Sequence, residues 1–317
     1  MQILLITNGM GFHGVTTYIS MLANSFYKTG NEVHIISMGS NTISYFFSGN
    51  TYIFGLTAQD LNSLDPHYIS KKLEKFIYKI EKSNGIKFDL ILLNMNLARR
   101  YGEFLNKWNT YAVIHDPNVA SHYNSFRLIA VSRYVKNLFE ENGYKDIIYI
   151  PLPFDPDAVR MRINGQCKYD NFVLFPHRCI NEKGINEAQQ LDNSIDDIII
   201  MFCNNIKIKS NKIIKLKRMP YPYSYFNKAK CTISLAKKEI AGYCVLESLA
   251  CGTPVYGYDS AGVAETMREY HSDWLVDPGD FRGIINLINN NRHFEINEKV
   301  FDKFNPYRIA NKYLALI

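Results

Sequence analysis

Apolar residues run along the first half of the chain in short continuous stretches that amphipathic segments separate. Residues 2–7 form the first stretch, and a glycine-rich turn and an amphipathic segment over 15–27 follow it. The pattern then predicts strands at 31–37, 88–93, 111–114, 128–132 and 147–150 and helices at 66–83 and 133–142. Continuously apolar strands that alternate with helices predict a parallel sheet covered on both faces.

A proline-rich segment, 151–157, interrupts this pattern and predicts the connection between two domains. The second half then predicts strands at 172–175, 197–202, 213–217, 231–235 and 254–257 and helices at 184–191, 242–251, 262–270 and 279–290. A last helix, from Pro306 onward, is expected to pack back across the molecule. We therefore predict an α/β protein of two Rossmann-like, doubly wound domains, 1–153 and 154–303, that face a cleft, with 304–317 as the returning helix.

Composition narrows the protein class. The chain has 317 residues, 47% of them hydrophobic, and no apolar run approaches the length of a membrane span. The N-terminus lacks the basic region and cleavage site of a signal peptide, so a cytoplasmic protein is expected. The six cysteines form no Cys-x-x-Cys pair, which favours reduced, buried thiols. No metal site is predicted, because the Asp-x-Asp pair of Asp155 and Asp157 lies in the proline-rich connection.

The net charge of +6 permits a polyanionic partner without requiring one. Basic residues gather in one short segment, where they alternate with Ile and Leu: Lys207, Lys209, Lys212, Lys215, Lys217 and Arg218. Such a segment is either a solvated face or a surface that contacts phosphate groups. Both interpretations remain open at this point.

Two acidic residues, Glu239 and Glu247, flank the predicted start of a helix. Because Gly242 is a poor residue for a helix interior, we expect Glu239 in the loop before the helix and Glu247 within it. A carboxylate, a glycine turn and a helix N-terminus then share one small space. Carboxylates accept hydrogen bonds from hydroxyl groups, and a helix N-terminus attracts anions. This stretch therefore predicts a site for a polyhydroxylated, phosphate-bearing ligand.

Further polar residues follow predicted strands. Arg178 and Lys183 leave the strand at 172–175, and together they suit a diphosphate, although either alone is typical of a surface. His115 and Asp116 end the strand at 111–114, where a histidine either points toward a ligand or is a hydrogen-bonded loop residue. The glycine turn after the first strand either lets a ligand approach the backbone closely or only joins strand to helix.

Together these residues resemble the retaining GT-B glycosyltransferases of family four. The resemblance rests on Arg178 with Lys183-Gly184, on Glu239 with Glu247, and on the Ala-Cys-Gly-Thr-Pro-Val run over 250–255, and it spans almost the whole chain. It implies transfer of a sugar from a nucleotide-diphosphate sugar, expected to be UDP-linked, to a hydroxyl with retention of configuration and without a metal. In the implied catalytic set, Arg178 and Lys183 neutralise the diphosphate, Glu239 contacts the transferred sugar, and His115 contacts the sugar or the phosphate. The implied donor-binding residues are Gly11, Gly14, Arg178, Lys183, Glu239, Gly242, Tyr243, Cys244, Val245 and Glu247, with Glu247 on the ribose hydroxyls.

A narrower resemblance concerns the acceptor. The Gly-Val-Thr sequence at 14–16 and the His115-Asp116 pair look like those of the T-even phage α-glucosyltransferases that modify hydroxymethylcytosine in DNA. This resemblance implies double-stranded DNA as a partner, contacted by His13, Asp116, Lys207, Lys209 and Lys212. The alternative acceptor is a cell-surface polysaccharide or glycolipid, for which the basic segment 66–83 would lie on an anionic membrane. A sugar-nucleotide epimerase and a non-catalytic binding module also remain as alternatives, and the sequence gives no oligomeric state.

Overall fold

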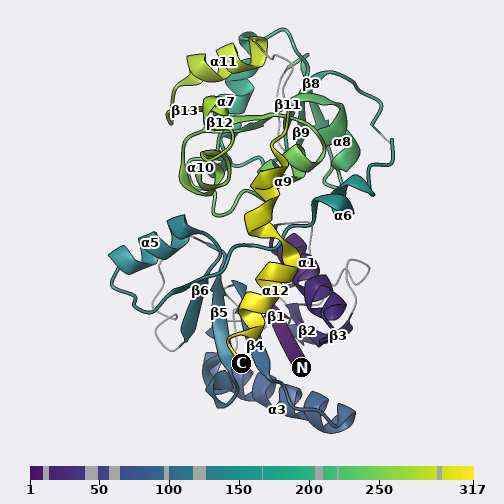
Figure 1. The fold of residues 1–317 in the computed structure, drawn as a ribbon, viewed down its shortest axis with the longest axis vertical. Helices are drawn as coiled ribbons and strands as arrows, with labels where there is room; N and C mark the ends of the chain where they lie inside the picture. Colours follow the sequence, from purple (N-terminus) through teal and green to yellow (C-terminus); the bar gives the residue numbers. More distant parts are fainter. Residues whose placement is uncertain are drawn as a thin grey trace. The chain divides into compact units, whose positions relative to one another are not determined.

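The computed structural model describes residues 1–9, 14–39, 49–56, 65–95, 100–116, 126–165, 167–203, 210–219, 221–290 and 295–317. These residues form two compact units, one of Met1–Pro153 with Phe304–Ile317 and one of Phe154–Lys303. Each unit holds one parallel sheet with helices beside it (Figure 1). The predicted fold class, α/β with two parallel sheets, is confirmed.

The first unit has a seven-stranded sheet in the order β3-β2-β1-β4-β5-β6-β7. Its strands are β1 (Gln2–Thr7), β2 (Glu32–Gly39), β3 (Asn50–Leu56), β4 (Leu90–Asn94), β5 (Thr110–Ile114), β6 (Arg127–Ala130) and β7 (Ile148–Tyr149). Its helices include α1 (Gly14–Lys28), α3 (Pro66–Asn84) and α5 (Arg133–Glu141). The sequence pattern did not predict β3, because this edge strand has exposed and half-buried side chains along most of its length.

The last helix, α12 (Pro306–Leu314), belongs to the first unit and packs on α1 (Figure 1). Its first turn is capped by the side chain of Asn305, which accepts hydrogen bonds from the backbone N–H groups of Tyr307 and Arg308 at 3.1 Å each. The hydroxyls of Tyr313 and Tyr18 are 2.6 Å apart, so a buried hydrogen bond joins α12 to α1.

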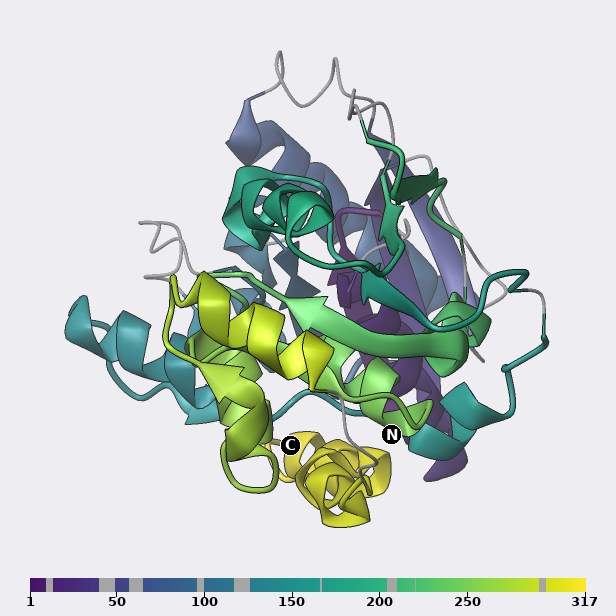
Figure 2. The ribbon, with the colours of Figure 1, turned by 90° about the horizontal axis from the view of Figure 1, so that it is seen from above.

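The second unit has a six-stranded sheet in the order β10-β9-β8-β11-β12-β13. Its strands are β8 (Phe172–Phe175), β9 (Ile199–Phe202), β10 (Ile213–Leu216), β11 (Ala229–Ser234), β12 (Val255–Tyr258) and β13 (Leu275–Val276). Its helices are α6 (Pro156–Arg160), α7 (Ile185–Gln190), α8 (Tyr223–Lys228), α9 (Tyr243–Ala250), α10 (Ala261–Met267) and α11 (Phe281–Asn289). Figure 2 shows α10 and α11, in yellow-green, beside the strands of this sheet, and both contact β12.

The proline-rich connection contains a short helix that the sequence pattern did not predict. Pro156 occupies the first turn of α6, where the missing N–H group is tolerated. The side chain of Asp155 accepts a hydrogen bond from the N–H of Ala158 at 3.1 Å and caps the helix. Asp155 is therefore a helix-capping residue in this structure.

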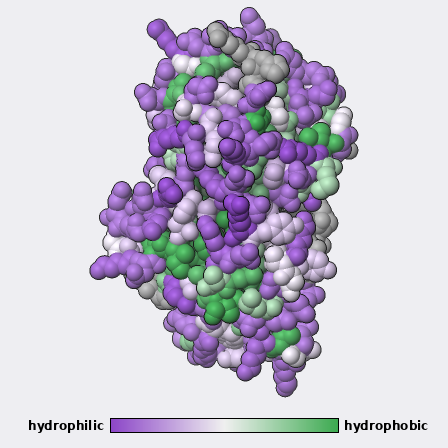
Figure 3. Space-filling view, in the orientation of Figure 1, coloured by the Kyte–Doolittle hydropathy of each residue, from purple (hydrophilic) through white to green (hydrophobic). Residues whose placement is uncertain are grey.

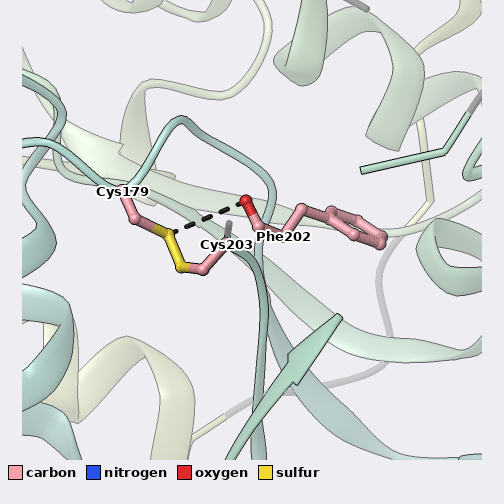
Figure 4. The surroundings of a disulfide bond; sticks show 3 residues. All are labelled: Cys179, Phe202 and Cys203. Carbon is pink, nitrogen blue, oxygen red and sulfur yellow. Dashed lines mark hydrogen bonds between the residues drawn. A yellow bond between two sulfur atoms is a disulfide. The ribbon is translucent and has the colours of Figure 1, made fainter. Parts of the chain in front are cut away.

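The expectation of reduced thiols is wrong for two of the six cysteines. A disulfide joins Cys179 to Cys203, with their Cα atoms 5.6 Å apart (Figure 4). The two residues are 24 positions apart in sequence, but they follow the neighbouring parallel strands β8 and β9 and so lie at the same edge of the sheet. The remaining cysteines, Cys167, Cys231, Cys244 and Cys251, are free thiols.

The surface is largely polar. Hydrophilic residues, in purple, cover most of the face in Figure 3, whereas the strands β1, β4 and β8 are almost wholly buried. Within the described ranges, no helix is both long and apolar enough to cross a bilayer.

Candidate active site

The second unit brings Arg178, Lys183 and Glu239 to one edge of its sheet. Strands β8 and β11 are parallel neighbours, with Leu174 opposite Thr232. The loops that follow two parallel strands leave at the same edge, which is where ligands bind in open α/β sheets. Arg178 and Lys183 lie in the loop after β8, and Glu239 lies in the loop between β11 and α9.

A glycine permits the contact between these two loops. Gly184 has a φ of +80°, and a Cβ atom added there would lie 2.5 Å from the carbonyl oxygen of Leu235. The loop after β8 therefore packs closely against the end of β11. As a result, Nζ of Lys183 lies 2.8 Å from Oε2 of Glu239, in an ion pair whose side chains are only 14% and 17% exposed.

Glu239 is held as a carboxylate. Burial alone would raise the pKa of Glu239. The charge of Lys183, then that of His177 when it is protonated, and the hydrogen bonds from Lys183 and the N–H of Ile240 outweigh burial and leave the pKa below its ordinary value. The N–H of Ile240 donates to Oε1 of Glu239 at 3.2 Å. The backbone carbonyl of Glu239 also accepts a hydrogen bond from the N–H of Gly262 at 2.7 Å, which fixes the loop from its other side.

His177 lies at the centre of this cluster, although its sequence position gave only a weak signal. Its Nε2 atom is 2.9 Å from Oγ of Ser234 and 3.5 Å from Sγ of Cys244. Burial lowers the pKa of His177 to about 4, so the ring is neutral at pH 7 and its 3.7 Å approach to Glu239 is not an ion pair. The signal that would have identified it is its place directly after a buried strand, two residues beyond Phe175.

Helix α9 begins where the sequence predicts, just after Gly242. That glycine has a φ of +59° and is the N-cap residue, which leaves Tyr243, Cys244 and Val245 in the first turn. The N–H of Val245 bonds to the carbonyl of Gly242 at 2.9 Å, and Cys244 retains its proton because burial raises the pKa of its thiol well above the ordinary value. The first turn of α9 thus places backbone N–H groups beside the loop that carries Glu239.

Glu247 lies one turn further along α9 and differs from Glu239. Its carboxyl group makes no hydrogen bond or ion pair with any described residue. Burial raises the pKa of Glu247 to about 8. A half-buried carboxyl without a polar partner is energetically unfavourable, and hydroxyl groups of a ligand would satisfy it.

Arg178 is exposed, and its guanidinium has no hydrogen-bond or ion-pair partner among the described residues. Its positive charge acts on a second arginine that the sequence analysis did not assign to the donor site. Burial, and then the charge of Arg178, lower the pKa of Arg218, which follows β10. Two guanidinium groups with like charge near one sheet edge favour an anion as their common partner.

In the first unit, His115 follows β5, as the sequence predicts. Its Nε2 atom is 2.9 Å from Oδ1 of Asn94, and its ring meets Tyr18 of α1 edge to face at a centroid distance of 4.6 Å. Nδ2 of Asn94 donates to the carbonyl of Leu92 at 3.0 Å, which identifies Oδ1 as the acceptor and places a proton on Nε2 of His115. Asp116 is half-buried beside it.

Of the other expected site residues, the structure describes Gly14 and Lys212. Gly14 begins α1 and is exposed, whereas Gly11, His13, Lys207 and Lys209 lie outside the described residues. Nζ of Lys212 donates to the carbonyl of Ile195 at 2.8 Å. Across the described ranges, no three His, Cys, Asp or Glu side chains are grouped as metal ligands.

Comparisons with known proteins show that this chain is similar to glycosyltransferases. Residues 206–299 match the family model described as glycosyl transferases group 1. The chain is 25% identical over 190 residues to an uncharacterized glycosyltransferase of Methanocaldococcus jannaschii. This match covers 53% of this chain and 51% of that protein. It is 22% identical over 170 residues to the capsular polysaccharide biosynthesis glycosyltransferase CapM of Staphylococcus aureus, covering 47% and 44%. The chain therefore spans about half the length of these two relatives.

Solved structures extend the likeness over the whole chain. Sucrose-phosphate synthase from Thermosynechococcus elongatus superposes with a TM-score of 0.71 at 16% identity, over 99% of this chain and 98% of that one. Anabaena HepE in complex with UDP and glucose superposes with a TM-score of 0.65 at 16% identity, over 100% and 97%. These neighbours establish the GT-B fold. The chain therefore has the fold of these glycosyltransferases, and residues 206–299 of its second unit are similar to the group 1 glycosyl transferase family.

Proposed function

We propose that this protein transfers a sugar from a UDP-sugar to a hydroxyl acceptor, with retention of configuration and without a metal. One observation carries the proposal. At one sheet edge the second unit gathers a neutralised carboxylate, a helix N-terminus, and a carboxyl and an arginine that have no partner among the described residues. This set complements a nucleotide-diphosphate sugar, which has hydroxyls at both ends and negative charge between them. The name of the HepE structure, which records UDP and glucose, supports UDP as the carrier.

Each residue then has a defined role. Arg178 and Lys183 bind the diphosphate and stabilise the negative charge that develops as it leaves. Glu247 accepts hydrogen bonds from the ribose hydroxyls, and Glu239 accepts them from the transferred sugar. The bond between the anomeric carbon and the phosphate oxygen breaks, the acceptor oxygen bonds to that carbon, and the acceptor proton passes to the departing UDP.

For the acceptor, we favour a hydroxyl of a cell-surface polysaccharide or glycolipid, modified in the cytoplasm at the membrane surface. The name of CapM supports this choice. Helix α3 supports it too, because it exposes five lysines along its length: Lys71, Lys72, Lys75, Lys79 and Lys82. Tyr68 and Tyr78 on the same helix are 47% and 46% exposed. Exposed lysines and aromatic rings together are typical of surfaces that bind anionic bilayers.

Hydroxymethylated DNA is the second candidate acceptor. The net charge of +6 and the exposed Lys215 and Lys217 at the end of the basic segment favour it. Binding to DNA would rest on phosphate contacts and would weaken steeply as salt rises.

A panel of nucleotide sugars tests the proposal. Purified protein is incubated with each donor and with hydroxymethylated DNA, unmodified DNA or a lipid-linked saccharide, and the glycosylated product is measured by mass spectrometry. We expect transfer from a UDP-sugar to the lipid-linked saccharide. Transfer only to hydroxymethylated DNA would replace the favoured acceptor by the second candidate. Conversion of the donor without any acceptor would indicate an epimerase or a hydrolase.

A further inference from the structure

The Cys179–Cys203 disulfide lies beside the arginine that the proposed donor site needs. Cys179 directly follows Arg178, and Cys203 directly follows β9, the strand next to β8. Sγ of Cys179 lies 3.7 Å from the carbonyl oxygen of Phe202, the last residue of β9 (Figure 4). Because a disulfide sulfur has no proton to donate, this approach is a packing contact. The bond therefore fixes the start of the loop after β8 to the neighbouring strand.

The same loop is anchored at its other end by packing. Gly184 lies against the carbonyl of Leu235, and Lys183 pairs with Glu239 at 2.8 Å. Both cations thus stand directly before an anchor: Arg178 before the disulfide and Lys183 before the glycine contact. The two cations differ in one respect. Lys183 has a salt bridge of its own, whereas the Arg178 side chain is exposed and has no partner among the described residues.

The disulfide also connects the loop to the segment that carries Arg218. The N–H of Cys203 donates to the carbonyl of Leu216, the last residue of β10, at 2.9 Å. Arg218 follows Leu216 closely in sequence, so the segments that bear the two arginines are linked through Cys203. Without this link, mutual repulsion would favour conformations in which the two guanidinium groups lie further apart.

We propose that the Cys179–Cys203 disulfide is a positioning element for Arg178, so that the affinity for the donor diphosphate depends on the redox state of this bond. The inference rests on the proposed function, since it assumes that Arg178 binds a diphosphate. Cys179 is half-buried and Cys203 is buried, so an attacking thiolate reaches Cys179 more readily. In a reducing cytoplasm such a bond is transient, so its reduction regulates the affinity for the donor.

The redox step is an exchange with a dithiol. A thiolate of the dithiol attacks Sγ of Cys179, the S–S bond breaks, and Cys203 leaves as a thiolate that takes up a proton. The second thiol of the dithiol then attacks the mixed disulfide and releases Cys179 as a thiol. Two electrons pass to the protein, and the dithiol becomes a disulfide.

The test measures the dissociation constants of UDP and of uridine by calorimetry for four proteins: wild type, Cys203→Ser, Arg178→Ala and the double variant. We expect Cys203→Ser to weaken UDP binding about tenfold and to leave uridine binding unchanged, because only UDP carries the diphosphate. Dithiothreitol should have the same effect on the wild type. Cys167→Ser is the matched control, because Cys167 is a free thiol elsewhere in the second unit.

The double variant separates positioning from general loosening of the fold. If the disulfide acts through Arg178, then Cys203→Ser should not weaken UDP binding further once Arg178 is alanine. Equal loss in both backgrounds, or a lower melting temperature with unchanged UDP affinity, would overturn the inference. If Arg178→Ala itself leaves UDP binding unchanged, the proposed donor site is wrong. A loss in Arg178→Ala without one in Cys203→Ser refutes only the positioning role.

Discussion

The two halves of the candidate site differ in how their charges are balanced. In one half, Lys183 and Glu239 neutralise each other at 2.8 Å and are mostly buried. In the other half, Arg178 is exposed without a partner and the carboxyl of Glu247 has none among the described residues. The paired half is complete without a ligand, and so it contributes to the fold and to preorganisation. The unpaired half needs a ligand that supplies an anion and hydroxyl groups, and so it should control the affinity for the donor.

The largest effect is expected from breaking the paired half. Lys183→Met leaves Glu239 buried without its cation, and we expect the free energy of unfolding to fall by about 3 kcal/mol. Turnover should fall roughly 100-fold to 1000-fold, because a cation is lost from the diphosphate. Urea denaturation and steady-state kinetics measure the two effects.

A matched control for this prediction is Lys237→Met. Lys237 pairs with Glu187 at 3.2 Å, but the Lys237 side chain is 61% exposed, so its loss should cost less than about 1 kcal/mol. Adding Glu239→Gln to Lys183→Met should restore part of the stability and none of the turnover. Equal stability losses for Lys183→Met and Lys237→Met would contradict the assignment of the buried pair to the fold.

Removing the exposed arginine should separate function from stability. Arg178→Ala is expected to lower turnover roughly 30-fold to 100-fold through loss of a charge-assisted contact to the diphosphate. The free energy of unfolding should change by less than about 0.5 kcal/mol, because the side chain is exposed and pairs with no described residue. Arg282→Ala, which removes another exposed arginine of the second unit, is the control and should change neither quantity. Wild-type turnover in Arg178→Ala would show that the diphosphate binds elsewhere.

The sequence predicts the fold well where burial is complete. The continuously apolar strands β1, β4, β8 and β9 lie where the pattern places them, because a strand buried on both faces must be apolar throughout. The exposed edge strand β3 and the short helices α6 and α8 carry no such periodic signal. Their formation depends on tertiary contacts or on a local cap such as Asp155.

The candidate site shows the same division. Arg178, Lys183, Glu239 and Glu247 could be singled out because they follow predicted strands or flank a predicted helix start. His177 and Ser234 could not be paired from the sequence, because their contact depends on β8 and β11 being neighbours in the sheet. The order of strands also explains the missed disulfide, since it requires β8 beside β9. Spacing along a chain predicts which sheet edge a residue reaches and leaves its neighbour at that edge undetermined.

The unpaired carboxyl should oppose stability and support affinity. Burial raises the pKa of Glu247 to about 8 from the ordinary 4.5, so between these values the folded protein binds more protons than the unfolded chain. The free energy of unfolding therefore falls as the pH rises from about 4.5 to about 8. Glu247→Gln removes this penalty and should stabilise the protein by about 2 kcal/mol at pH 8 and far less at pH 5.

The same variant should weaken donor binding about tenfold, because an amide accepts fewer hydrogen bonds from the ribose than a carboxylate does. Thermal unfolding and calorimetry with UDP at both pH values measure the two changes. Glu295→Gln, at an exposed carboxylate of the second unit, is the control. If Glu247→Gln stabilised the protein without weakening UDP binding, the carboxyl would be a buried residue without a ligand role.

The smallest effect at neutral pH should come from His177, which lies beside Glu239 and carries no charge at pH 7. Burial lowers the pKa of His177 to about 4. As the pH falls, this histidine is therefore protonated at a higher pH in the unfolded chain than in the folded protein. The histidine therefore removes stability as the pH falls from about 6.5 to about 4, and it has no such effect above pH 6.5.

His177→Gln keeps a polar group that can reach Ser234, and we expect it to unfold at a temperature close to that of the wild type at pH 7. At pH 4.5 the wild type should have lost more of its stability than the variant, by about 2 kcal/mol. A difference of the same size at both pH values would mean that His177 acts by packing and not through its protonation.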